Sequence, residues 1–226
     1  MCGVIGISLA KVDDSDIALV HKIFRESMIR GKHATGLTYL SDGRLTTHKS
    51  GIPVDAFLEK FDLNQCINED GGLYLIGHIR YSTSDLRYHQ PFANEEYGIV
   101  HNGVISQEDP SDWIFKTQTA NDSELVLHSL AVGRHPLVDF HPASMAVCTL
   151  SVDKELTGFR NEARPLYLTK LDKGVIFTST RDIAKRAGVI GETEKTTMYT
   201  IYRYKGGILS LDDTYEGIYP DVEDLQ

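Results

Sequence analysis

The sequence contains little cysteine, few basic residues and no long apolar run. Its three cysteines, Cys2, Cys66 and Cys148, are odd in number and widely spaced, which argues against a disulfide framework and against a zinc site. Nowhere do roughly 18 apolar residues run together, as a membrane-spanning helix requires, and the N-terminus lacks the basic and apolar segments of a signal peptide. We therefore expect a cytoplasmic protein without a membrane partner.

The charge balance is acidic. The chain has 23 Lys and Arg residues against 32 Asp and Glu residues, a formal net charge of -9. Because phosphate contacts need clustered basic side chains, we expect no nucleic-acid partner. Chemistry on a small molecule is the better expectation for 226 residues with 41% hydrophobic content, enough for one substantial core.

Periodicity predicts a sheet-rich chain with few helices. β-Branched residues and glycines predict a first strand at residues 3–9, with Cys2 at its tip, and apolar residues at spacings of three and four predict a helix over 14–30. Further strands are expected at 35–40, 44–49, 73–81, 98–105, 145–152, 166–171, 175–180 and 199–204, and further helices at 54–61, 122–132 and 181–187.

Many strands without strict strand–helix alternation favour antiparallel sheets covered by helices over a doubly wound parallel fold. Two stacked sheets between helix layers would fit this pattern. We expect one domain over residues 2–212, followed by an acidic, mobile tail over 213–226.

Cys2 is a candidate nucleophile. Because its side chain is small, we expect Met1 to be removed, which would leave Cys2 as the N-terminal residue. An ordinary thiol with a pKa of about 8.5 is mostly protonated at neutral pH and needs a base. The freed α-amino group, with a pKa of roughly 7.7–8.0, can be that base. Taken alone, however, a cysteine at this position is more often a small buried residue of a strand.

Other residues offer the remaining parts of an acyl-transfer site. Where a predicted strand meets a glycine, the Asn102 side-chain amide and the Gly103 N–H could together stabilise an oxyanion, although Asn-Gly is also a common tight turn. Arg80 ends a predicted strand and could bind a carboxylate, with Thr83 as a hydroxyl partner, or it could be a surface arginine. Asp122 could bind a substrate ammonium, or it could stabilise the start of a helix.

In order, these segments resemble the class II, or N-terminal-nucleophile, glutamine amidotransferases. The resemblance is carried by the ordered combination of segments. They are residues 1–6 (Met-Cys-Gly-Val-Ile-Gly), 30–36 (Arg-Gly-Lys-His-Ala-Thr-Gly), 77–83 (Gly-His-Ile-Arg-Tyr-Ser-Thr), 90–92 (Gln-Pro-Phe), 101–103 (His-Asn-Gly) and 119–124 (Thr-Ala-Asn-Asp-Ser-Glu). Weaker similarity occurs at 164–166 and 177–179.

The resemblance implies an α+β fold, a four-layer α/β/β/α sandwich of two antiparallel sheets between helix layers. It also implies residue roles. Cys2 is expected to be nucleophile and base, and Asn102 and Gly103 the oxyanion hole. The glutamine-binding residues are expected to be Arg80 and Asp122 at the α-carboxylate and α-amino groups, with Thr83 assisting and Arg30 organising the N-terminal site.

Three positions depart from the family pattern. His33 replaces an acid, Tyr81 stands where Trp is common, and Ser84 replaces a frequent His or Gly. These residues are expected to shape the loops that close over glutamine. His78 and His101 are expected to be structural, because none of the histidines shows the paired spacing of a metal site; no metal and no cofactor are expected.

The implied reaction converts glutamine to glutamate and ammonia through a Cys2 thioester. Too few residues follow the similar region for a second catalytic domain, so we expect the ammonia to pass to a separate synthase subunit. Two alternatives remain open, a stand-alone γ-glutamyl amidohydrolase and an inactive glutamine-sensing module.

Overall fold

Two antiparallel β-sheets form the centre of the protein. The structure is a computed structural model that describes residues 1–82 and 87–212. The first sheet has the order β11-β9-β10-β1-β4-β2-β3, and the second the order β13-β12-β8-β7-β6-β5. The strands of the first sheet are β1 (Gly3–Leu9), β2 (Ala34–Ser41), β3 (Arg44–Ser50), β4 (Leu73–Arg80), β9 (Tyr167–Leu171), β10 (Gly174–Thr178) and β11 (Glu192–Lys195). Those of the second sheet are β5 (Phe92–Ala93), β6 (Tyr97–Val104), β7 (Ser144–Ser151), β8 (Leu156–Arg160), β12 (Ile201–Lys205) and β13 (Ile208–Asp212).

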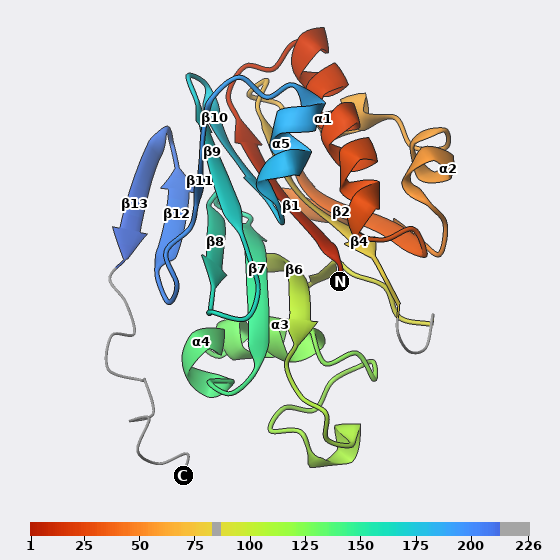
Figure 1. Ribbon diagram of the computed structural model, residues 1–226, viewed down its shortest axis with the longest axis vertical. Coiled ribbons are helices and arrows are strands. Elements are labelled where there is room, and N and C mark those ends of the chain that lie inside the picture. Colours follow the sequence, from red (N-terminus) through yellow and green to blue (C-terminus); the bar gives the residue numbers. More distant parts are fainter. Residues whose placement is uncertain (83–86, 213–226) are drawn as a thin grey trace.

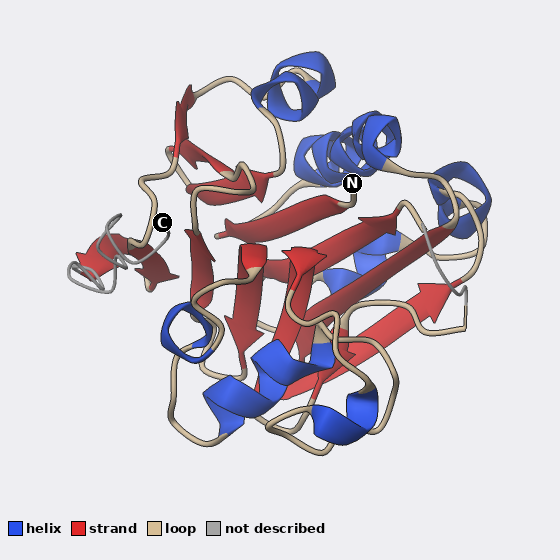
Figure 2. Cartoon of the chain, turned by 60° about the horizontal axis from the view of Figure 1, so that its bottom comes forward, coloured by secondary structure: helices blue, strands red, loops and turns tan. Residues whose placement is uncertain are grey.

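Helices cover the outer faces of the two sheets (Figures 1 and 2). Those on the first sheet are α1 (Asp14–Glu26), α2 (Val54–Leu58) and α5 (Arg181–Ala187), and those on the second are α3 (Glu124–Ala131) and α4 (Pro136–Asp139). Short 3-10 helices lie at Ser27–Arg30, Leu63–Cys66 and Pro110–Asp112. The layers therefore run helix, sheet, sheet, helix, which confirms the predicted four-layer α/β/β/α sandwich.

Side-chain alternation along the strands divides the core into layers. Val4, Ile76 and Val100 pack together between the two sheets, whereas their neighbours Ile5 and Leu75 face the layer of α1 and α5. Because successive strand residues point to opposite faces, the even-numbered positions at these ends of β1, β4 and β6 face the space between the sheets. The alternation thus determines which side chains can meet at the open end of the sandwich.

The predicted elements are found with small shifts in their boundaries. The first helix ends at Glu26 rather than near residue 30, and continues as the 3-10 helix Ser27–Arg30. At this junction the Ser27 hydroxyl donates to the Ile23 carbonyl at 2.7 Å, a side-chain contact that competes with regular helical pairing. The strands β5, β8, β11 and β13 and the helix α4 were not predicted.

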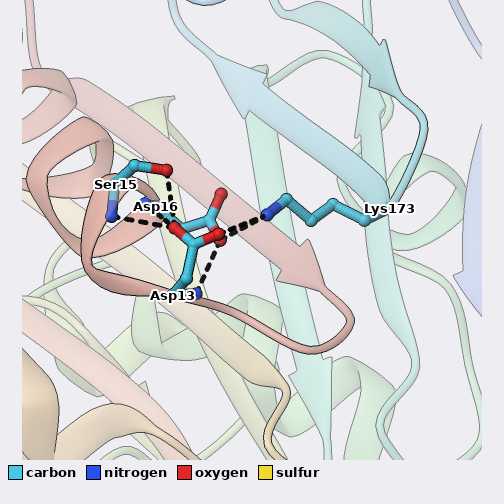
Figure 3. A network of polar contacts seen from close by, with 4 residues as sticks. All are labelled: Asp13, Ser15, Asp16 and Lys173. Carbon is cyan, nitrogen blue, oxygen red and sulfur yellow. Dashed lines mark hydrogen bonds and ion pairs between the residues drawn. The ribbon is translucent and has the colours of Figure 1, made fainter.

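The start of α1 is fixed by a polar network that joins it to the β9–β10 turn (Figure 3). Asp13 caps the helix by accepting from the Ser15 and Asp16 N–H groups, and Asp16 accepts from the Asp13 N–H at 2.8 Å, which forms a capping box. Lys173 contacts Asp16 at 2.5 Å. The network holds the N-terminal end of α1 against the sheet that contains β1.

No helix in the described ranges is long and apolar enough to cross a membrane. The predicted acidic tail, residues 213–226, lies outside the described residues.

Candidate active site

The ends of three strands bring the candidate residues together. Cys2 precedes β1, Arg80 ends β4, and Asn102 lies near the end of β6. All three occupy even-numbered positions, which face the space between the sheets. The N-terminus accordingly lies beside the ends of β4 and β6 (Figure 1).

Asn102 contacts Cys2 directly. The Cys2 backbone N–H donates to Asn102 Oδ1 at 3.0 Å, and Asn102 is only 2% exposed. The other end of the same amide, Nδ2, is buried and has no hydrogen-bond partner among the described residues. Because an unsatisfied buried donor is costly, an unpaired amide at this position is the pattern expected of a group reserved for a ligand.

The backbone N–H of Gly103 points away from β7. Along an antiparallel strand, successive N–H groups point to opposite sides. The Val104 N–H donates to Ser144, which begins β7, and the His101 N–H donates to the Gln90 side chain on the other side. Gly103 therefore shares the orientation of His101. A side chain here is excluded, because a Cβ would lie 1.8 Å from the Ser144 carbonyl oxygen.

Arg30 contacts Cys2 from outside the cavity. Its Nε donates to the Cys2 carbonyl at 3.4 Å, and its Nη2 is buried without a hydrogen-bond partner among the described residues. The residue closes the 3-10 helix that follows α1, so the first helix brings this cation to the N-terminal strand.

Arg80 is held at the mouth of the site. It is 9% exposed, and its Nη1 donates to the Tyr88 carbonyl and lies 3.2 Å from His89 Nδ1. The alternative of a surface arginine on an edge strand does not apply, because β4 lies between β1 and β2.

Asp122 does not cap α3. That helix begins at Glu124, and no side chain caps its first turn. Instead, Asp122 Oδ2 accepts from the N–H groups of Ile105 and Ser106 at 2.6 and 3.3 Å. The carboxylate thus organises the chain that leaves β6, and Oδ1 accepts no hydrogen bond from the described residues.

One cavity of about 350 Å³ joins most of these residues. Cys2, Arg80, Gly103 and Asp122 line it. Asn102 contacts the Cys2 nitrogen and Arg30 contacts the Cys2 carbonyl, but neither residue lines the cavity. Further lining comes from His78, Tyr81, Ser82, Tyr88, Gln90, His101, Glu108, Trp113 and Ser123.

Two of the positions that depart from the family pattern form a contact beside Cys2. His33 Nδ1 accepts from the Ser82 N–H at 2.8 Å, and its ring lies 5.2 Å from that of Tyr81. The Cys2 thiol lies 3.8 Å from the Tyr81 carbonyl oxygen. The predicted site residue Thr83 and the departing residue Ser84 lie outside the described residues.

Burial governs the titration of this site. Burial raises the pKa of the Cys2 thiol, and the N-terminal ammonium, Arg80 and Arg30 oppose that rise. Burial also lowers the pKa of His78 to about 3, and it lowers the pKa of His101. Both imidazoles are therefore neutral at neutral pH, while the thiol needs a base to ionise.

A hydrogen-bonded group beside His101 of β6 was not predicted. The Gln90 side chain pairs with the backbone of His101, and Ser123 Oγ contacts both Gln90 Nε2 and the His101 ring. The sequence carried one signal, the Gln-Pro-Phe segment, but gave no indication of its partner. Within the described ranges, no three His, Cys, Asp or Glu residues are grouped as a metal site would require.

Comparisons with known proteins bear on the fold. No protein-family model and no curated protein matches the chain. Among solved structures, one match is glutamine phosphoribosylpyrophosphate amidotransferase from B. subtilis, complexed with ADP and GMP. It has a TM-score of 0.71 and 17% identity, and the match covers 93% of this chain and 49% of that chain. The chain has the fold of a class II glutamine amidotransferase domain.

Two further structures share this amidotransferase fold. An allosteric regulatory enzyme of purine biosynthesis matches with a TM-score of 0.70 and 18% identity, over 93% of this chain and 48% of that chain. A glutamine aminotransferase class-II domain protein from Silicibacter pomeroyi matches with a TM-score of 0.57 and 10% identity, over 95% and 99%. The chain thus spans about half the length of the first two proteins. These matches support the resemblance seen in the sequence.

Proposed function

We propose that the protein hydrolyses the side-chain amide of glutamine, with Cys2 as an N-terminal nucleophile after removal of Met1. The observation that carries this proposal is the Cys2–Asn102 contact. Asn102 uses Oδ1 to hold the nitrogen of Cys2, and its buried Nδ2 donor, beside the thiol residue, has no partner within residues 1–82 and 87–212. A nucleophile and an oxyanion donor are the two groups that acyl transfer must place together.

Removal of Met1 converts the Cys2 nitrogen into an α-amino group. Since burial raises the pKa of the thiol, the thiol needs a base, and an amine with a pKa of roughly 7.7–8.0 is suited to that task near neutral pH. Asn102 Oδ1 orients this amine by accepting a hydrogen bond from it. Met1 is attached to the same nitrogen, so its loss also opens space beside the Asn102 amide.

The reaction then follows from these groups. The amine accepts the thiol proton, and the thiolate sulfur bonds to the δ-carbon of glutamine while the carbonyl electrons move to oxygen. Asn102 Nδ2 and the Gly103 N–H donate to that oxyanion. The protonated amine gives its proton to the amide nitrogen, the carbon–nitrogen bond breaks and ammonia leaves. Water, deprotonated by the same amine, then attacks the thioester carbon, the carbon–sulfur bond breaks, and the amine returns the proton to the departing Cys2 thiolate as glutamate is released.

Charges in the cavity fit the two ends of an amino acid. Arg80 and Asp122 line the same space as Cys2, and we assign them to the α-carboxylate and the α-ammonium of glutamine. Asp122 Oδ1 is available for this role while Oδ2 holds the two backbone N–H groups. Arg30 favours the thiolate by its charge and fixes the Cys2 carbonyl. Thr83 is assigned by resemblance to assist at the glutamine.

By resemblance to the class II glutamine amidotransferases, the ammonia is assigned to a separate synthase subunit. The three cysteines are free thiols, which supports a reducing, cytoplasmic location.

A glutaminase assay with mass analysis tests the proposal. The purified protein is expected to lack Met1 and to release glutamate from glutamine, whereas Cys2→Ala is expected to fold and release none. Cys66→Ala is the matched control, because Cys66 is buried in the helix-side core away from the cavity, and it is expected to remain active. Glutamate release by Cys2→Ala at the wild-type rate would refute the mechanism.

A further inference from the structure

The strand β6, which carries Asn102 and Gly103, has a neighbouring strand on only one side at these two residues. On one side β6 pairs with β7 from Tyr97 to Val104, but on the other side β5 pairs only with Ile99 and Gly98. The N–H and carbonyl groups of His101 face this second side, where no strand continues. An unpaired backbone here would leave the following residues, Asn102 and Gly103, supported only by β7 on the opposite side.

The Gln90 side chain fills the missing position. The His101 N–H donates to Gln90 Oε1 at 2.6 Å, and Gln90 Nε2 donates to the His101 carbonyl at 3.0 Å. This is the two-bond exchange that a neighbouring antiparallel strand would provide. Gln90 is 5% exposed and His101 is 1% exposed, so water does not replace these bonds readily.

The Gln90 amide also contacts Ser123, the neighbour of Asp122, which we assigned to the substrate ammonium. Gln90 Nε2 donates a second hydrogen bond to Ser123 Oγ at 3.0 Å, and Ser123 Oγ lies 2.8 Å from His101 Nδ1. Ser123 follows Asp122 in the chain. Both Nε2 protons are thereby used by the protein, so Gln90 has no donor left for a ligand even though it lines the cavity.

We propose that Gln90 is a positioning residue for glutamine hydrolysis. Its side chain takes the place of a neighbouring strand at His101 and thereby fixes the oxyanion donors of Asn102 and Gly103 relative to Asp122. This inference rests on the proposed glutaminase function. It assigns Gln90 no contact with substrate. Its effect is exerted in the transition state, where the position of the donors matters most.

Gln90→Met tests the proposal, because the new side chain has a similar length and neither bond. We expect kcat to fall at least about tenfold, approaching the about 10²–10³-fold loss caused by deleting an oxyanion donor outright, with KM changed by less than about threefold. The rate of Cys2 alkylation by iodoacetamide, which forms no oxyanion, should stay within about twofold of the wild-type rate. Thr169→Val is the matched control. Thr169 lies on β9, two strands from β1, and its hydroxyl pairs with that of Thr193 on β11. The variant removes this pair and should change thermal stability without changing kcat.

Gln90→Glu provides a second test with a readout that a merely structural role does not move. An ionised carboxylate can accept from the His101 N–H but cannot donate to its carbonyl, whereas a protonated carboxyl can do both. The ratio of variant to wild-type kcat should therefore rise as the pH falls from 8 to 5.5. The titratable and charged groups that line the same cavity, Cys2, His78, Arg80, Tyr81, Tyr88, His101, Glu108 and Asp122, are present in both proteins. A pH-dependent difference between the two proteins therefore originates from the carboxyl group at position 90.

The outcomes separate this proposal from the function on which it rests. If the wild-type protein releases no glutamate, the proposed function fails. If the wild type is active and Gln90→Met retains its kcat, or if kcat and the alkylation rate fall together, the positioning role fails while the function stands. If neither variant folds, Gln90 is a residue of the fold and the positioning role is rejected.

Discussion

The backbone nitrogen of Cys2 lies 3.0 Å from Oδ1 of Asn102, although the two residues are 100 positions apart in the chain. The contact crosses from one sheet of the sandwich to the other, because Cys2 directly precedes β1 of the first sheet and Asn102 lies near the end of β6 of the second. Asn102 Nδ2 has no hydrogen-bond partner among the described residues, and the proposed mechanism uses that donor together with the thiol.

Asn102→Asp separates the two ends of this amide. The carboxylate still accepts from the Cys2 nitrogen, but it cannot donate to an oxyanion. We expect kcat for glutamine hydrolysis to fall by about 10²–10³-fold while the protein folds normally, as measured by steady-state glutamate release and circular dichroism. Asn64→Ala, at an exposed asparagine beside Asp62, is the control and should retain wild-type kcat. An active Asn102→Asp variant would exclude Asn102 from the oxyanion hole.

Asp122→Asn tests the assignment of the substrate ammonium. The amide oxygen can still accept from the Ile105 and Ser106 N–H groups, but the negative charge is lost. A hydrogen bond to a charged group contributes about 1.5–3 kcal/mol, so KM for glutamine should rise roughly tenfold to 150-fold, with a smaller change in kcat. Asp139→Asn, which alters a contact with Ser129 and Arg134 behind α3, is the control. An unchanged KM in the Asp122 variant would place the ammonium elsewhere.

Arg30→Met tests the electrostatics of the nucleophile. Burial raises the pKa of Cys2, and the charge of Arg30 lowers it, so loss of that charge should raise the pKa further. A thiol with a higher pKa needs a higher pH to form the thiolate. The pH profile of Cys2 alkylation by iodoacetamide should therefore shift upward. Arg25→Met, at an exposed arginine paired with Asp55, should leave the profile in place. A shift toward lower pH would contradict the assigned role.

Asp13→Asn tests the network that anchors α1. Hydrogen bonds from Ser15 and Asp16 lower the pKa of Asp13 to about 2, below the value of about 3.9 expected in the unfolded chain. A depressed pKa contributes stability above the unfolded pKa, and this contribution is lost as the pH falls through the folded pKa. Chemical denaturation should show the variant to be less stable at pH 6, with the difference shrinking between pH 4 and pH 2. A difference independent of pH would contradict the titration.

Local patterns in the sequence predicted most of the strands because their β-branched and apolar runs end at turn-forming residues, and predicted the first helix because its apolar residues recur at spacings of three and four. The strand β8 was missed because it is short and has Gly158 at its centre. The structure explains that glycine, since a Cβ at this position would lie 2.5 Å from the Phe177 ring of the opposite sheet. Such close packing across two sheets leaves no periodic signal in the sequence.

The candidate site was predicted through residue types, not through geometry. Cys2 and Asn102 were identified from the chemistry they could perform and from their resemblance to a family, yet their contact depends on the stacking of two sheets. Gln90 was visible only as part of a segment. Its side chain pairs with the His101 backbone as a neighbouring strand would. Secondary-structure propensity and hydrophobic periodicity do not predict such a contact.

Covalent labelling of the purified protein with a glutamine analogue that carries a reactive diazoketone tests the central claim most directly. Intact-mass measurement followed by peptide mapping should show one adduct, on the sulfur of Cys2, in a chain that begins with Cys2, and excess glutamine should slow its formation. A chain that keeps Met1, or an adduct on any other residue, would contradict the assignment of Cys2 as the N-terminal nucleophile.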